Sequence, residues 1–284
     1  MIIKKFFKFL NSFKLLKTAT AYVFFSGLNG LVPFLLLPII TNYLNPEEYG
    51  IANLFQTTFL FMVPLVGLSM GFNIDKLFFR EKKDYLAKSI SNMLFILLIT
   101  IFLSSFLILI LTFFFDLSFI GFPVFWLKII PIISGFAAIS EYNLILLRNQ
   151  DKVKYFGFWQ IGYTCLNMGL SLFLIISLLK GWEGRVLGIV ISTITIGILS
   201  ILNIRRMGYL TLNINYNEVK KILNLCTPLL FHGLCTFAIF QSNRYFININ
   251  LNQAAVGIFS VAVAFSSLMG IVKDGLARTL NPWF

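Results

Sequence analysis

The chain has 284 residues, of which 58% are hydrophobic and 12% are charged, and its 23 Lys and Arg against 11 Asp and Glu give a net charge of +12. Such an excess of positive charge would suggest a nucleic-acid partner in a soluble protein, but this composition is typical of a membrane protein, and we expect no nucleic acid to bind. The basic residues are instead interpreted as markers of membrane topology.

The N-terminal segment, residues 1–18, is basic and also rich in Phe and Leu. This pattern predicts an amphipathic helix lying on the membrane surface, in contact with membrane lipids. The apolar run that follows is too long for the core of a signal peptide and contains Asn29, Pro33 and Pro38.

Eight apolar runs are long enough to span a bilayer, whose hydrocarbon core of about 30 Å requires about 20 mostly apolar residues in a helix. They predict an all-α, polytopic membrane protein with about eight transmembrane helices. In chain order the runs are 19–41, 51–74, 89–115, 124–147, 156–179, 186–203, 225–250 and 254–272.

Nearly all Lys and Arg residues lie in every second gap between these runs. On the other side only Lys180 and Arg185 lie in gaps, whereas Lys128 and Arg244 lie inside or at the edge of runs. Because short loops rich in Lys and Arg stay in the cytoplasm, we expect both the N-terminus and the C-terminus to be cytoplasmic.

Several function classes have no support in the sequence. Cys165, Cys226 and Cys235 lack metal-ligand spacing, and the chain has one histidine, so we expect no metal and no cofactor. There is no Walker-type loop and no kinase signature, and the outer gaps are too short for a catalytic domain, which predicts that the protein is not an enzyme. No segment resembles a channel filter, and the short connections suit a transporter that moves helix bundles.

A short motif occurs twice. Leu44–Ile51 and Leu251–Ile258 both read L-N-x-x-x-x-G-I, 207 residues apart, and both lie on the outer side of the predicted topology. The match indicates a parallel repeat of six spans. We expect Asn45 and Asn252 to cap the helices that follow. We expect the glycine of each copy to adopt backbone angles closed to other residues and to let the next helix begin close to the last.

Polar side chains within the spans are the candidate substrate-binding residues, because they are costly in lipid unless they face a bundle interior or a wet cavity. Charges inside spans indicate function, although long side chains also reach toward the interface and small polar stripes more often mediate helix packing. His232, Thr236 and Asn243 share a narrow arc at helical spacing. The full predicted set is Asn29, Gln56, Glu141, Gln160, Asn167, His232, Thr236, Asn243 and Arg244.

The run Leu37–Gly50, L-P-I-I-T-N-Y-L-N-P-E-E-Y-G, resembles the first hairpin of the MOP (multidrug/oligosaccharidyl-lipid/polysaccharide) exporter superfamily, most closely the Wzx-type polysaccharide flippases of O-antigen, lipopolysaccharide and capsule assembly. The basic segment Asp75–Lys88 and the ending Asn281–Phe284 add to the likeness. The resemblance implies a multi-pass protein of the bacterial inner membrane that flips an undecaprenyl-type lipid-linked oligosaccharide by alternating access, alongside a polymerase and other assembly proteins.

The resemblance also implies two six-helix lobes, so the chain is expected to be truncated. On this interpretation residues 19–203 form the N-terminal lobe, residues 204–224 a cytoplasmic linker, and residues 225–284 the first two helices of an incomplete C-terminal lobe. Arg244 would hold the phosphate, and Asn, Gln and Thr side chains would bind sugar hydroxyls. Two alternatives remain: a multidrug or metabolite cation antiporter, or a non-transporting, truncated membrane protein associated with polysaccharide assembly.

Overall fold

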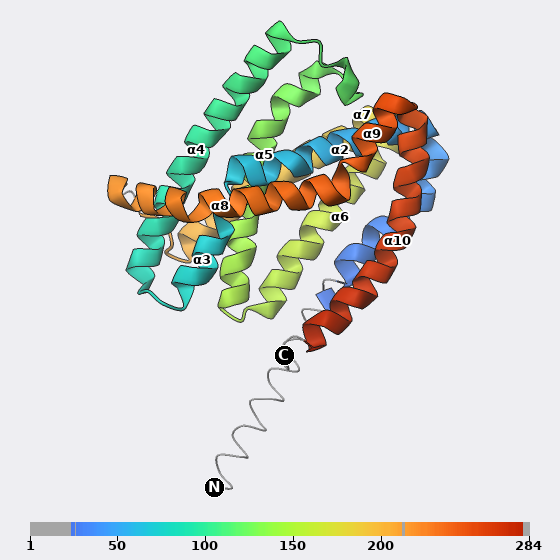
Figure 1. Ribbon diagram of the computed structural model, residues 1–284. Coiled ribbons are helices and arrows are strands. Elements are labelled where there is room, and N and C mark those ends of the chain that lie inside the picture. Colours follow the sequence, from blue (N-terminus) through green and yellow to red (C-terminus); the bar gives the residue numbers. More distant parts are fainter. Residues whose placement is uncertain (1–23, 26, 212–213, 281–284) are drawn as a thin grey trace, which may run out of the picture.

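The computed structural model describes residues 24–25, 27–211 and 214–280, with side chains outside the description at 118 and 267–280. The predicted surface segment, residues 1–18, lies outside the described residues. Over the described ranges the chain is helical and contains no strand. Figure 1 shows the helices, which are, in chain order, Gly27–Tyr43, α2 (Pro46–Gly67), α3 (Gly71–Phe78), α4 (Lys83–Phe114), the short η1 (Ser118–Ile120), α5 (Val124–Asn149), α6 (Val153–Leu178), α7 (Gly181–Arg206), α8 (Tyr216–Gln241), α9 (Asn243–Asn250) and α10 (Gln253–Leu280).

Six of the described helices, α2 and α4 to α8, are long and apolar enough to cross a membrane. The predicted all-α, polytopic fold is therefore confirmed. The first and last predicted spans fall on the helix Gly27–Tyr43 and on α10, whose described apolar parts are shorter. These two helices run side by side, with the rings of Phe34 and Phe265 at 5.3 Å (Figure 1).

Two predicted spans are interrupted in the structure. The prediction of a continuous span over 51–74 is wrong, because α2 ends where Leu68 and Ser69 adopt left-handed backbone angles, with φ of 47° and 50°. The prediction of one span over 225–250 is also wrong: α8 ends at Gln241, and α9 begins after a turn at Ser242.

Helices α7 and α8 begin earlier in the chain than predicted. The sixth span, expected over 186–203, is the 26-residue α7. Arg185 therefore lies inside a membrane-spanning helix rather than in a loop. α8 begins at Tyr216, so the second part of the expected linker 204–224 is helical.

The described chain packs around two main apolar cores, which lie toward opposite ends of the helices. One joins the end of α2 with α3, the first part of α4, α5 and the first turns of α8, around Met70, Ile90 and Tyr142. The other joins the start of α2 with the end of α4, the starts of α5 and α7, and α10, around Phe55, Ile130 and Val256. Helices α2, α4 and α5 contribute to both cores and so hold the bundle together.

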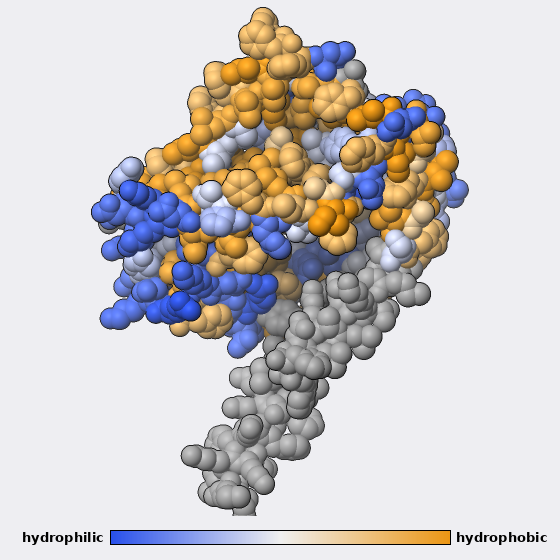
Figure 2. All heavy atoms as spheres, viewed as in Figure 1, coloured by the Kyte–Doolittle hydropathy of each residue, from blue (hydrophilic) through white to orange (hydrophobic). Residues whose placement is uncertain are grey.

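The outer surface of α4 is suited to lipid. Only 17% of the most apolar stretch of α4 is buried within the protein. In a soluble protein most side chains of such a stretch would be buried in the core. In Figure 2 hydrophilic residues gather over α3 and the first turns of α4 and α8, whereas the surface beyond them is mainly hydrophobic. The exposed apolar side chains of α4 include Leu98, Phe102, Leu103, Phe106 and Leu107.

Both expected helix caps are present. The Asn45 side chain accepts a hydrogen bond from the Glu48 backbone N–H at 2.8 Å, and the Glu48 carboxylate accepts one from the Asn45 N–H at 3.1 Å. The Asn252 side chain accepts one from the Ala255 N–H at 2.8 Å. Each copy of the repeated motif therefore satisfies one of the free N–H groups at the start of its helix.

Substitution of Asn45 by alanine is expected to lower the free energy of unfolding by about 1 kcal/mol, because the Glu48 N–H loses its acceptor. Thermal unfolding of the purified protein in detergent measures the change. The matched control is Asn42→Ala, at an exposed position of the preceding helix. Equal melting temperatures for the two variants would show that the cap does not stabilise α2.

Candidate functional site

A cavity of about 280 Å³ lies between the helix Gly27–Tyr43, α2, α6, α7, α9 and α10. Two arginines from distant parts of the chain, Arg185 of α7 and Arg244 of α9, both line it. The other lining residues are Gly30, Pro33, Phe34, Leu37, Ile40, Tyr49, Ala52, Asn53, Gln56, Met168, Ser260, Val263 and Ala264. The cavity therefore has apolar walls with a few polar groups and two cations, which is the usual make-up of a ligand site.

Arg185 is held in place by α6. The residue is 7% exposed, and its guanidinium donates to the Asn167 Oδ1 at 2.5 Å and to the Ser171 Oγ at 2.8 Å. The two helices approach closely because position 188 is a glycine: a Cβ atom there would lie 2.2 Å from the Ser171 Oγ. Helix α6 thus supplies neutral acceptors that orient the guanidinium.

Arg244 is held from the other side of the cavity. Its Nε donates to the Ser260 Oγ of α10 at 3.3 Å, and its guanidinium also donates to the Gln241 Oε1. Gln241 is the last residue of α8, so this hydrogen bond spans the turn at Ser242 that separates α8 from α9. The guanidinium is therefore positioned by three consecutive helices.

Neither guanidinium forms an ion pair with a described residue. Within the described ranges, ion pairs join Arg148 to Asp75 and Lys221 to Glu218, and neither pair lines the cavity. Desolvation of a charge without a counter-charge is costly, and two arginines at one cavity give it a positive potential. Planar guanidinium groups bind phosphate and carboxylate oxygens in a bidentate manner, so the cavity is suited to an anion.

Three of the nine predicted residues line this cavity or hold a residue that lines it. Gln56 and Arg244 line it, and Asn167 holds Arg185. Asn29 and Gln160 are not among the lining residues: the Thr164 hydroxyl of α6 donates to the Asn29 Oδ1 and, at 3.2 Å, to the backbone carbonyl of Gln160 one turn earlier on α6. The Gln160 Oε1 is buried and has no hydrogen-bond partner among the described residues.

The other four predicted residues do not line the cavity. On α8 the Thr236 hydroxyl donates to the His232 carbonyl at 2.9 Å, and both side chains are exposed. Asn243 follows the turn at Ser242, so the predicted arc of three residues does not continue along one helix. Glu141 of α5 is exposed and lies beside α3, where a Cβ on Gly71 would be 3.5 Å from its Oε1.

Arg185 was not among the predicted site residues, because the predicted sixth span began one position after it. A signal was present: Gly184 and Gly188 form a G-x-x-x-G motif, which permits close helix contact in membranes, and Arg185 lies within it. Asn53, a further polar residue of the second span, also lines the cavity, as do Tyr49 and Ser260, which were not predicted.

A search of curated proteins found no match to the chain. One solved structure, described as protein A, is similar over 94% of this chain with a TM-score of 0.64 and 14% sequence identity. At that identity the likeness shows the fold alone. The chain spans 64% of the length of that structure.

A comparison with protein families matches residues 15–284 to the polysaccharide biosynthesis proteins. The match covers most of the chain, including the repeated motif and both cavity arginines. It supports the resemblance to the exporter superfamily without selecting the Wzx type. The chain is therefore a multi-pass membrane protein that belongs to the polysaccharide biosynthesis protein family.

Proposed function

We propose that the protein moves a lipid-linked oligosaccharide, on an undecaprenyl-type carrier, across the bacterial cytoplasmic membrane during polysaccharide assembly, by alternating access. The observation that carries the proposal is the cavity lined by Arg185 and Arg244, two cations in a membrane-spanning bundle that form no ion pair with any described carboxylate. Membership of the polysaccharide biosynthesis family supports a saccharide cargo. A polymerase and other assembly proteins would receive it.

The cargo chemistry matches the groups at the cavity. The diphosphate that links lipid to sugar is anionic, so two guanidinium groups can bind its oxygens by charge-assisted hydrogen bonds. Asn53 and Gln56 offer amide groups for sugar hydroxyls on the same wall. A cavity of about 280 Å³ is too small for a whole oligosaccharide, so we assign it to the anionic linkage, with the lipid chain remaining in the bilayer.

The alternative of a cation antiporter fits this cavity less well. A site for a cationic drug needs a carboxylate, and among the residues that the structure describes none of those lining the cavity is Asp or Glu. Glu141 is a carboxylate within a span, but it lies beside α3. The third alternative, a non-transporting membrane protein, is compatible with the same structure. Only a transport assay distinguishes it from the other two.

Reconstitution tests the three functions against one another. The purified chain is placed in liposomes that contain a fluorescent lipid-diphosphate oligosaccharide, and the accessible fraction of the sugar is followed with time; uptake of a cationic dye is measured in parallel. Sugar movement without dye uptake supports the proposal. Dye uptake alone supports the antiporter, and the absence of both supports the non-transporting protein.

Substitution Arg244→Gln is expected to slow sugar movement about tenfold or more, since one charge-assisted contact to the diphosphate is lost. The control is Arg206→Gln, which removes an exposed positive charge at the end of α7. The same rate in Arg244→Gln and Arg206→Gln would remove the cavity from the transport path.

A further inference from the structure

The two copies of the repeated motif pack directly on each other. A Cβ atom on Gly50 of α2 would lie 1.9 Å from the backbone oxygen of Gln253, and one on Gly257 of α10 would lie 2.0 Å from the backbone oxygen of Pro46. Gly50 and Gly257 are equivalent in the repeat, and so are Pro46 and Gln253. The contact is therefore reciprocal: each glycine accommodates the first turn of the other helix.

The structure corrects the role expected for these glycines. Positive φ is found at Gly121, Gly181 and Gly208, but not at Gly50 or Gly257, both of which are helical. They are required because any side chain would enter the backbone of the facing helix, at distances that real Cβ atoms do not reach. Their absence of a side chain permits contact between helices, not a tight turn.

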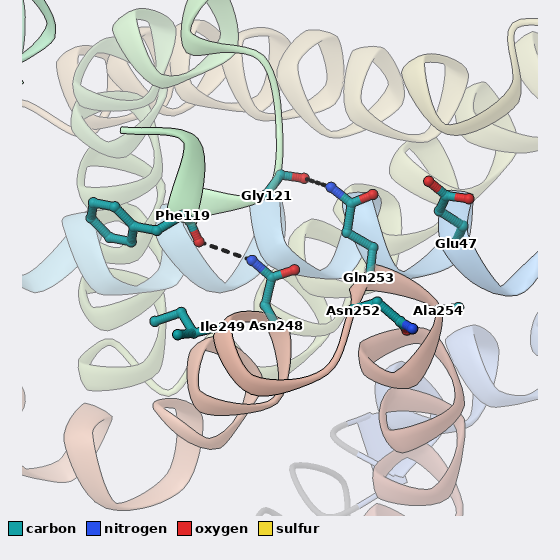
Figure 3. Close-up of a pocket in the computed structure, with 8 residues that line it drawn as sticks. All are labelled: Glu47, Phe119, Gly121, Asn248, Ile249, Asn252, Gln253 and Ala254. Carbon is teal, nitrogen blue, oxygen red and sulfur yellow. Dashed lines mark hydrogen bonds between the residues drawn. The ribbon is translucent and has the colours of Figure 1, made fainter. Parts of the chain in front are cut away.

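Two amide side chains hold the same end of the bundle together. The Gln253 Nε2 donates to the Gly121 carbonyl at 2.8 Å, and the Asn248 Nδ2 donates to the Phe119 carbonyl at 2.9 Å. Figure 3 shows both hydrogen bonds, which run from α9 and α10 to the segment between α4 and α5. The helices after residue 241 are thus attached both to α2 and to the α4–α5 connection.

The reciprocal contact lies next to the arginine cavity. Asn53 is one helical turn after Gly50, and Ser260 is one turn after Gly257; both line the cavity, and Ser260 also binds Arg244. The Thr58 hydroxyl is 2.6 Å from the Tyr245 hydroxyl, which joins α2 to the residue after Arg244. When Gly50 and Gly257 are in contact, the cavity is therefore closed toward the end of the bundle where α2 and α10 begin.

We propose that the Gly50–Gly257 contact, held by Gln253 and Asn248, is a gate that shuts the arginine cavity from the side carrying the two repeat motifs. The proposal rests on the proposed transport function, and it identifies which helices must separate for the cargo to leave on that side. Parting α9 and α10 from α2 breaks the reciprocal glycine contact and the Thr58–Tyr245 hydrogen bond, and parting them from the α4–α5 connection breaks the two amide hydrogen bonds, while each helix stays intact. The predicted topology places this gate at the outer face of the membrane.

The test is access to a cysteine placed at Asn53 in a chain whose three native cysteines are replaced by alanine. A thiol reagent that does not cross membranes is applied separately to each face of oriented membrane vesicles. With both glycines present, we expect slow labelling from the outer face. Gly50→Ala and Gly257→Ala are each expected to raise that rate about tenfold, because the added methyl group prevents closure.

The matched control is Gly162→Ala on α6, where a Cβ atom meets nothing within 4 Å. A second variant, Asn248→Ala with Gln253→Ala, adds no atoms and so cannot misfold through overpacking. It is expected to raise the labelling rate from the outer face as well. Rates equal to that of Gly162→Ala in all these variants would overturn the gate, as would an increase seen only from the inner face. Labelling needs no cargo, so the gate can hold even if the liposomes move no sugar.

Discussion

Replacing Arg185 by glutamine is expected to weaken the binding of inorganic pyrophosphate, a probe for the diphosphate linkage, by about tenfold to a hundredfold. Arg185 is the more deeply fixed of the two cavity arginines, since Asn167 and Ser171 orient its guanidinium from α6. Glutamine keeps a hydrogen-bonding group but removes the charge. Titration calorimetry of the protein in detergent measures the affinity directly.

Two further variants separate charge from geometry. Arg185→Lys keeps the charge but loses the planar pair of donors, so its affinity is expected to fall between those of the native protein and Arg185→Gln. Arg206→Gln, at the exposed end of the same helix, is expected to bind pyrophosphate as the native protein does. If Arg185→Gln also binds normally, the cavity is not the anion site.

Replacing Gly188 by leucine is expected to lower the free energy of unfolding by about 3 kcal/mol or more. Overpacking costs about 1–3 kcal/mol where neighbours can move, and here the neighbour includes backbone. A Cβ at position 188 would lie 2.8 Å from the Ser171 N and 2.9 Å from its Cα. The α6–α7 contact must open, and Arg185 then loses its acceptors.

Thermal unfolding in detergent and the yield of membrane-inserted protein measure this effect. Gly162→Leu is the control, because that glycine of α6 has open space around it. A loss of stability in Gly188→Leu but not in Gly162→Leu supports the close α6–α7 contact. Equal stability of the two variants would contradict it.

Features that depend on neighbouring residues in the chain could be predicted from the sequence. Both asparagine caps are examples, since a cap needs only the side chain and the N–H groups two or three residues later. The existence of the apolar helices is another, because length and hydropathy decide whether a helix can span a bilayer. The turn at Ser242 was missed because the predicted span was carried through the polar run 241–244 to the apolar residues beyond it, while the hydrogen bond from Arg244 to Gln241 that spans the turn depends on side chains.

The cavity required information that the sequence holds only indirectly. Arg185 was assigned to a loop because charge near the end of an apolar run usually marks the membrane surface. Its interior position depends on Asn167 and Ser171, which lie on another helix and whose distance from it is a property of packing. Likewise, the repeated motif revealed two equivalent hairpins, but not that Gly50 and Gly257 would meet.

The reciprocal contact has an electrostatic consequence. It places the N-terminal ends of α2 and α10 beside each other, and the partial positive charges of two helix macrodipoles repel when they meet. Helix α2 carries Glu47 and Glu48 in its first turn, whereas α10 carries no acidic residue there. Each carboxylate offsets the repulsion by about 0.3–1 kcal/mol. The closed contact is therefore opposed by repulsion between the two helix ends, which Glu47 and Glu48 of the first repeat copy reduce. Neutralising these glutamates would make α2 and α10 separate more easily.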